Sequence, residues 1–303
     1  MKDDQASSTA YLIARSTAYL SRDPQLGHFV PSEAAEASAW FMRVCSPRAD
    51  KELEAMNGKW FRWRSGLAER LSVPGIILHY IMRKRYIEEA VRNSMEEGFQ
   101  QIVVLAGGFD TLALRLHQKF TEVNFIEVDH PATQKLKREA LEQRGFPKPN
   151  MSFLSVDFTK QTLEERLQSC DAYDPKLNTL FIAEGVLMYL TAEEVGTIFR
   201  FIREYGGPRT RFAFTFMEPH RGKVRFKNSS LAVDFWLWLK NEEFDWGIMR
   251  DDLPDYLQSS RFEFLDLATP DTFRTQYLKP EGLEDVTLAD GEYVCLAEAS
   301  RDR

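Results

Sequence analysis

The sequence predicts an α/β fold: a doubly wound, seven-stranded and mostly parallel sheet with an N-terminal helical cap. From residue 99 onward, short apolar runs alternate with segments of helical periodicity, the pattern of repeated strand-helix-strand units. Before residue 99, aromatic and charged residues interleave as in helices and are broken at prolines. We therefore expect one domain over residues 1–303, with a cap over 1–98 and a core over 99–303.

Each element of the core has its own signal. The helix before the fifth strand is the best marked, because Thr191 and Glu194 form a capping box and Gly206 supplies a stop. The aromatic stretch Leu231–Trp246 is too apolar for a solvated loop. The predicted strands are Gln101–Leu105, Val123–Asp129, Met151–Val156, Thr179–Ala183, Arg211–Phe216, Phe262–Leu267 and Tyr293–Ala297.

Composition excludes several classes of protein. With 303 residues and 44% hydrophobic content the chain can bury a large core, so disorder is excluded. A net charge of −7 argues against a nucleic-acid partner, which needs a clustered positive surface. No apolar run approaches the roughly 20 residues of a membrane helix, so we expect no membrane partner and a cytoplasmic location. The three cysteines lie far apart, which predicts neither disulfides nor a metal site.

The first predicted strand runs into the small residues Ala106, Gly107 and Gly108, and a helix begins near Thr111. Small residues let the backbone approach a ligand at the carboxyl edge of a parallel sheet. A tight turn without a ligand explains the same residues equally well. A dinucleotide is disfavoured, because its glycine fingerprint needs a third glycine where this chain has Leu112.

Acidic residues end the next three predicted strands. Asp129 would accept hydrogen bonds from ribose hydroxyls, or cap the helix that begins near Pro131. Asp157 beside Phe158 would hold adenine, or belong to an ordinary turn. Glu184 lies in an apolar stretch and needs a partner, either a cationic ligand or an arginine of the protein. Together these strand ends favour a nucleoside ligand.

Several blocks in order are similar to one family, the leucine carboxyl methyltransferases with their bacterial O-methyltransferase branch. The resemblance covers nearly the whole chain and implies a Rossmann-like class I methyltransferase fold. It also implies S-adenosyl-L-methionine as cofactor, S-adenosyl-L-homocysteine as product and no metal. The matching blocks are Tyr19–Val30, Arg83–Ala90, Leu105–Thr111, Glu127–Pro131, Ala183–Tyr189 and Glu243–Gly247.

The resemblance also implies residue roles. Arg85 would bind the methionine carboxylate of the cofactor, a task for a bidentate guanidinium, unless it belongs to a solvated helix face with Arg83 and Lys84. Tyr189 would lie nearest the substrate, unless it is a core residue. The other cofactor-binding residues implied are Ala106, Gly107, Gly108, Asp129, Asp157, Phe158 and Glu184.

Three departures from the family pattern stand out. Ala106 occupies the position of a usual glycine and would be strained if the turn requires a positive φ. Leu112 occupies a position where the bacterial branch often has arginine, and the family's N-terminal basic contact has no clear counterpart. These departures are the support for one alternative, a catalytically silent cofactor-binding interaction module.

The favoured function is an O-methyltransferase acting on a carboxylate or hydroxyl of a small metabolite or natural-product intermediate. In-line methyl transfer needs alignment more than acid-base groups, and an ionised carboxylate needs no general base. The basic run His220–Lys227 would attract an anionic acceptor, or form a solvated loop face. The partner we expect is therefore an anionic or phenolic small molecule. A second enzymatic alternative is methylation of a protein C-terminal carboxylate, and the oligomeric state is open.

Overall fold

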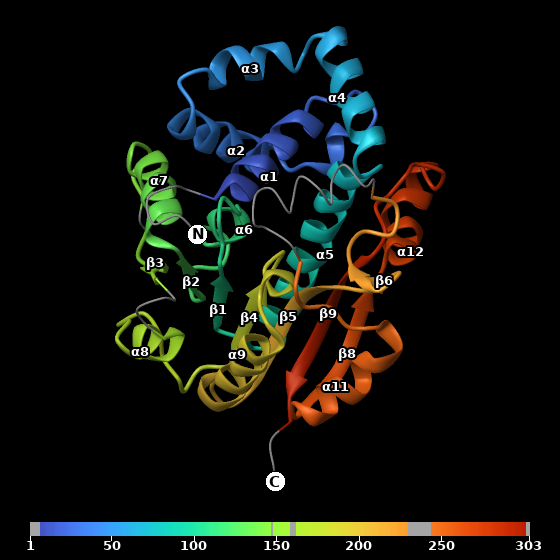
Figure 1. Cartoon of the computed structure of the whole chain (residues 1–303). Coiled ribbons are helices and arrows are strands. Elements are labelled where there is room, and N and C mark those ends of the chain that lie inside the picture. The colour runs from blue at the N-terminus through green and yellow to red at the C-terminus, as the bar shows by residue number, and fades with distance from the viewer. Residues whose placement is uncertain (1–6, 147, 158–161, 230–243, 301–303) are drawn as a thin grey trace. The chain divides into compact units, whose positions relative to one another are not determined.

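The computed structural model describes residues 7–146, 148–157, 162–229 and 244–300 (Figure 1). Its seven-stranded sheet has the order β3-β2-β1-β4-β5-β9-β8. β9 runs antiparallel to β5 and β8, whereas β2 is parallel to β1 and β3, and β4 is parallel to β5. The strands are β1 Gln101–Leu105, β2 Asn124–Asp129, β3 Met151–Ser155, β4 Thr179–Ala183, β5 Thr210–Met217, β8 Phe262–Ala268 and β9 Glu292–Ala299.

This sheet confirms all seven predicted strands. Strands buried on both faces appear in the sequence as continuous apolar runs, and every residue of β1, β4 and β5 is buried. A two-stranded pair, β6 Pro219–His220 and β7 Lys223–Val224, was not predicted. It is too short to carry a periodic pattern.

The chain divides into two compact units, which are described separately below. Unit 1 comprises residues 1–66 and 100–174, and unit 2 comprises residues 67–99 and 175–303. Each unit holds part of the N-terminal helices and part of the sheet. Neither unit corresponds to the expected cap or core, and the single-domain organisation stays a prediction.

Unit 1 contains β1, β2 and β3 and packs its α2 against both α1 and α7. The α1, α2 and α3 helices share a core of small and flexible apolar side chains that includes Ala18, Ala39 and Met42. On α2, Phe41 stacks on Phe109 with ring centroids 5.0 Å apart. The helices of this unit are α1 Ser8–Leu20, η1 Gly27–Phe29, α2 Ser32–Cys45, α3 Ala49–Ala55, α6 Leu112–Leu116, α7 Pro131–Glu142 and α8 Leu163–Gln168.

Unit 2 contains β4, β5, β8 and β9, with α9 against β5 and α11 against β8 (Figure 1). The predicted capping box is present, since Thr191 accepts from the Glu194 amide and Glu194 accepts from the Thr191 amide. Phe199 of α9 is the centre of an edge-to-face aromatic cluster with Phe212 and Phe214. The helices are α5 Ile76–Glu96, η2 Leu187–Tyr189, α9 Ala192–Tyr205, η3 Arg250–Asp252, α11 Leu253–Ser259, α12 Pro270–Phe273, the π-turn η4 Arg274–Leu278 and η5 Lys279–Glu281.

The α4 helix, Lys59–Leu71, contains the border between the two units. None of its residues is buried, and Trp60 and Trp63 are 68% and 58% exposed, so these aromatics are not the core of a helical layer. Among the described residues, no helix is both long and apolar enough to cross a membrane.

Candidate functional site

In unit 1, the turn after β1 has an unusual backbone. Gly108 and Ala106 both have φ of +49°, and glycine adopts this left-handed conformation freely whereas alanine does not. The turn is fastened to β2, since the Gly107 amide donates to the Val128 carbonyl at 3.2 Å. The Asp110 amide closes the turn on the Gly107 carbonyl at 2.8 Å. The strain expected for Ala106 in such a turn is therefore present.

Asp129 lies at the end of β2 and faces this turn. Its Oδ2 accepts from the Gly108 amide at 2.6 Å, and its Oδ1 accepts from the His130 amide at 2.6 Å. A carboxylate has about four acceptor sites, so both oxygens retain capacity for further donors such as hydroxyls. Burial raises the pKa of Asp129, although the bonds from His130 and Gly108 oppose that rise.

Asp129 is not the N-cap of the α7 helix, the alternative that the sequence left open. The N-cap of α7 is His130, whose ring Nδ1 accepts from the Ala132 amide at 3.3 Å. Asp129 instead binds the turn, which lies 21 residues earlier in the chain. The helix itself begins at Pro131 as predicted.

The expected adenine pair is only partly described. Asp157 is half-buried two residues after β3 and has an interaction partner. Phe158 lies outside the described residues. The adenine role of these two residues stays a prediction.

A buried ion pair beneath the turn was not foreseen. Glu127 of β2 and Lys137 of α7 form a salt bridge, and each side chain is 2% exposed. Lys137 Nζ also donates to the Asp110 carbonyl at 2.7 Å. Burial, opposed by Lys137, raises the pKa of Glu127 to about 7. The signal was available in the sequence, because a glutamate inside an otherwise apolar strand needs a cation.

In unit 2, Glu184 follows β4 and has protein cations as its partners. Arg83 Nη2 lies 2.8 Å from Glu184 Oε1, and Lys84 Nζ lies 3.0 Å from Glu184 Oε2. Both cations come from α5. Of the two partners left open for Glu184, an arginine of the protein is the one present.

Arg83 is also held from its other side. Its Nη1 lies 2.6 Å and 2.7 Å from the two oxygens of Glu292, the first residue of β9. His79 Nε2 lies 3.1 Å from Glu292 Oε2. Burial opposes ionisation of Glu292, but Arg83 and His79 outweigh it and lower its pKa to about 2. The result is a buried charge cluster of α5, β4 and β9 that we call the Arg83 cluster: His79, Arg83, Lys84, Glu184 and Glu292.

Arg85 does not join this cluster and lies on a solvated helix face, which is the alternative that the sequence left open for it. It is exposed, pairs with Glu89 one turn later at 3.3 Å, and lies over the Tyr277 ring at 4.5 Å. The helical period explains the difference. Buried positions of α5 recur at 79, 82, 83, 86, 87 and 90, and residue 85 falls outside that stripe. A phase count over the helix would have selected Arg83.

Tyr189 ends the short helix η2 that follows β4. It packs at the edge of an apolar cluster with Met188 and Met217, and its ring meets Phe244 edge to face at 5.3 Å. These contacts support the interpretation of Tyr189 as a packing residue. Its substrate-proximal role stays a prediction, and residues 231–243 of the predicted aromatic stretch lie outside the described residues.

The basic run after β5 is partly neutralised within unit 2. Lys227 Nζ lies 2.6 Å from Glu218, which also accepts from Arg250 at 3.1 Å and from Tyr293 at 3.0 Å. Burial opposes ionisation of Glu218, but the bonds from Lys227 and Arg250 lower its pKa to about 2. Lys227 is thus committed to a protein carboxylate, whereas Lys223 is exposed. Within the described ranges, no group of three or more potential ligands could hold a metal ion.

Comparison with known proteins defines the class. A crystal structure of a candidate methyltransferase from Thermobifida fusca is similar with a TM-score of 0.54 and 16% identity, over 81% of this chain and 90% of that one. The fold is that of the α/β class I methyltransferases. The sequence profile described as leucine carboxyl methyltransferase matches residues 5–203, and the chain belongs to this family.

Two relatives share the general description of candidate S-adenosyl-L-methionine-dependent methyltransferases. YktD of Bacillus subtilis is 30% identical over 146 residues, which are 46% of this chain and 45% of that protein. Rv3399 of Mycobacterium tuberculosis is 27% identical over 228 residues, which are 70% of this chain and 63% of that protein. This chain therefore matches less than two thirds of the length of either relative.

Proposed function

We propose that this protein is an S-adenosyl-L-methionine-dependent O-methyltransferase that acts on a carboxylate or hydroxyl of a small-molecule acceptor. The observation that carries the proposal is the bond between Asp129 and the Gly108 amide, which sets the carboxylate at the end of β2 against the left-handed turn after β1. Ligands of such sheets bind at the carboxyl ends of the parallel strands. Membership in the family supports the same donor.

Unit 1 supplies the residues that we assign to the nucleoside. Asp129 keeps acceptor capacity on both oxygens after its two backbone bonds, which fits a pair of ribose hydroxyls. The turn residues Ala106, Gly107 and Gly108, to which the family resemblance gives the methionine portion of the cofactor, are small enough for the protein backbone to approach the ligand closely. We retain Asp157 and Phe158 as the proposed adenine contacts.

In unit 2, Glu184 stays a proposed cofactor contact, and Lys84 lies beside it. Glu184 is 11% exposed and Lys84 is 18% exposed, so both retain some accessible surface, whereas Arg83 is 2% exposed. We propose that Glu184, which Arg83 orients, keeps the cofactor contact that the resemblance implied for it. Lys84 takes the cofactor-binding role that the resemblance implied for Arg85. The cofactor supplies an activated methyl group, and these residues bind and orient it.

The histidines favour a carboxylate over a hydroxyl acceptor. A hydroxyl requires a base, while a carboxylate is ionised at neutral pH. His79 is held by Glu292, His117 Nδ1 lies 3.0 Å from the Leu114 carbonyl, and His130 caps α7. Three of the five histidines thus have structural partners.

Calorimetric titration with S-adenosyl-L-methionine and S-adenosyl-L-homocysteine tests the proposal. We expect the native chain to bind both and Asp129→Ala to lose binding. Arg85→Ala is the matched control and should bind like the native chain, because its side chain is exposed and paired with Glu89. A native chain that binds neither compound contradicts the proposal. If it binds, labelled methyl donor with carboxylate, hydroxyl and peptide acceptors identifies the acceptor class.

A further inference from the structure

The strained turn of unit 1 requires something to hold it. Ala106 has φ of +49°, a conformation that costs an L-residue free energy and persists only where surrounding contacts impose it. Gly108, with the same φ, carries no such cost. The question is which contacts keep Ala106 in this conformation.

The Glu127–Lys137 pair supplies one of these contacts, in addition to the bonds from the turn to Val128 and Asp129. Lys137 Nζ reaches the Asp110 carbonyl at 2.7 Å and the Glu127 carboxylate at the same time. It therefore joins the far end of the turn to both α7 and β2. A Cβ atom on Gly107 would lie 3.5 Å from Glu127 Oε2, so the carboxylate lies directly beneath the turn. The Phe41 ring, 5.7 Å from Nζ, covers the pair.

The pair is poorly explained by stability alone. Two charges that are each 2% exposed lose their hydration, and apolar residues of the same volume are often at least as stabilising. One oxygen, Glu127 Oε1, is buried and has no hydrogen-bond partner among the residues that the structure describes, which adds a further cost. An apolar pair would not bind the Asp110 carbonyl, and that contact is what the ion pair provides.

We propose that Lys137 and Glu127 are positioning residues for the methyl-donor site, which hold the 106–110 turn in its strained conformation. The proposal rests on the proposed function, because the turn matters only if the donor binds there. Lys137 contacts the turn directly, and Glu127 orients Lys137. Neither residue is assigned a contact with the cofactor or acceptor.

The test is a double-mutant cycle that combines substitution of the Glu127–Lys137 pair with substitution of the strained residue Ala106. Lys137→Met with Glu127→Gln removes the contact to the turn without leaving an unpaired buried charge. We expect this double variant to fold and to bind S-adenosyl-L-homocysteine about tenfold more weakly, within the range of couplings between contacting residues. Adding Ala106→Gly should restore most of the affinity, because glycine adopts the left-handed conformation without the pair. Ala106→Gly in the native chain measures the effect of the substitution itself, and that effect should be smaller than the one in the double variant.

Arg261→Gly is the matched control for the glycine substitution. Arg261 also has a positive φ, +61°, but lies before β8 in unit 2. It should relieve strain there without restoring affinity in the double variant. If the double variant does not fold, Lys137→Gln with Glu127→Gln replaces it as a neutral polar pair, with a smaller loss that Ala106→Gly again restores.

The outcomes separate this inference from the proposed function. A native chain that does not bind the cofactor contradicts the proposed function. A native chain that binds, with a double variant of equal affinity, overturns the positioning role. Equal effects of Ala106→Gly in both backgrounds overturn it as well, since the pair and the strain would then be independent.

Discussion

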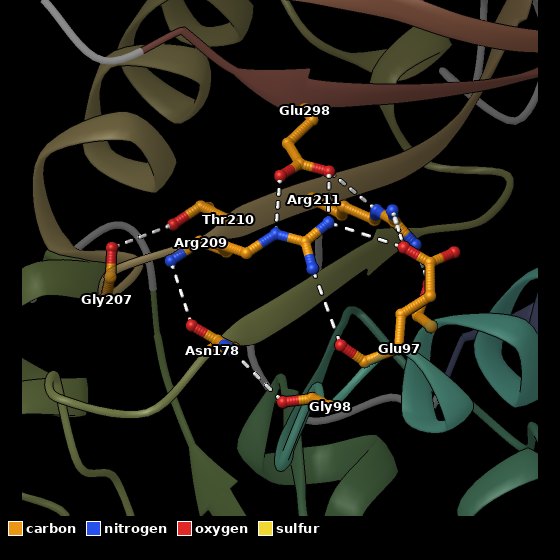
Figure 2. Close-up of polar contacts among 9 residues, drawn as sticks. Glu97, Gly98, Asn178, Gly207, Arg209, Thr210, Arg211 and Glu298 are labelled. Carbon is orange, nitrogen blue, oxygen red and sulfur yellow. Dashed lines mark hydrogen bonds and ion pairs between the residues drawn. The ribbon is translucent and has the colours of Figure 1, made fainter. Parts of the chain in front are cut away.

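Two clusters of arginines and carboxylates hold unit 2 at opposite ends of its parallel strands. Figure 2 shows the cluster at the strand starts, which we call the Arg211 cluster: Arg209, Arg211, Glu97 and Glu298. Arg209 and Arg211 each bind Glu298 at 2.9 Å, and both lie over the Phe99 ring. The Arg83 cluster lies at the strand ends, because Glu184 follows β4 and Glu292 pairs with the last residue of β5.

The clusters share their chemistry but differ in burial. Side chains of Arg209 and Glu97 are 40% and 47% exposed, whereas those of Arg83 and Glu292 are 2% and 1% exposed. Water stabilises an exposed charge whose partner is lost, but a buried charge depends on its partner. The strand ends are also the ligand-binding edge of such a sheet. The two clusters use the same residue types in different roles. The Arg211 cluster fastens the starts of the strands, and the Arg83 cluster positions a charge at the ends of the strands.

The largest expected effect is that of Arg83→Met. It should lower the free energy of unfolding by about 3–5 kcal/mol, because the buried Glu292 carboxylate loses its cation. Denaturant unfolding measures the loss. Arg83→Met combined with Glu292→Gln removes the stranded charge and should recover most of it. A double variant as unstable as the single one would show that lost packing, not charge, is the cause.

Glu184→Gln should act on binding more than on stability. We expect its affinity for S-adenosyl-L-homocysteine to fall by about 2 kcal/mol, roughly thirtyfold, because this proposed cofactor contact loses its charge. The glutamine keeps acceptor and volume, so the unfolding free energy should change by less than about 1 kcal/mol. Glu298→Gln makes the same chemical change in the Arg211 cluster and should leave affinity unchanged. Equal affinity losses in both variants would remove the distinction between the clusters.

Arg211→Met should cost less stability than Arg83→Met. The loss should be about 1.5 kcal/mol, the scale of hydrogen bonds to charged groups, because Arg209 still pairs with both Glu97 and Glu298. Cofactor affinity should stay that of the native chain, as measured by calorimetry. The Arg211 side chain is itself 8% exposed, so this variant tests the exposure of its carboxylate partners, 47% for Glu97 and 22% for Glu298. A loss as large as that of Arg83→Met would mean that the exposure of the carboxylates does not separate the two clusters.

The elements that sequence predicted well are those with a local signal. β1 and β4 are apolar after their first residue, β5 is rich in phenylalanine, and the capping box at Thr191 lies within four residues. Strain at Ala106 followed from a single substitution in a recognisable turn. Each of these features depends on neighbouring residues, which a single sequence records directly.

Partners of charged side chains were harder to predict. Glu184 clearly needed a cation, but its choice of Arg83 over Arg85 depends on the rotation of α5. Glu292 lies 209 residues from Arg83, a separation at which no local pattern links the two. Lys137 and Glu127 are only ten residues apart, yet their meeting requires α7 to pack on β2. Tertiary packing, not propensity, decides these pairs.

The smallest expected difference between the two clusters is in how stability depends on acid pH. Burial opposes ionisation of Glu298, but Arg209 and Arg211 lower its pKa below the ordinary 4.5, and similar contacts lower that of Glu292 to about 2. When the folded-state pKa is the lower one, the unfolded chain binds more protons in this window, so stability is present above pH 4.5 and is lost as the pH falls. The decline should continue to about pH 2, where Glu292 protonates.

Glu298→Gln should flatten the upper part of this acid decline. The change should be less than about 1 kcal/mol, because the Glu298 side chain is partly exposed and water screens its pairs. Unfolding measured from pH 6 to pH 3 tests it, with the exposed Glu281→Gln as a control that keeps the native pH slope. If Glu298→Gln also keeps the native slope, the Arg211 cluster fastens the strand starts through hydrogen bonding and packing on Phe99, and its charge contributes nothing to stability.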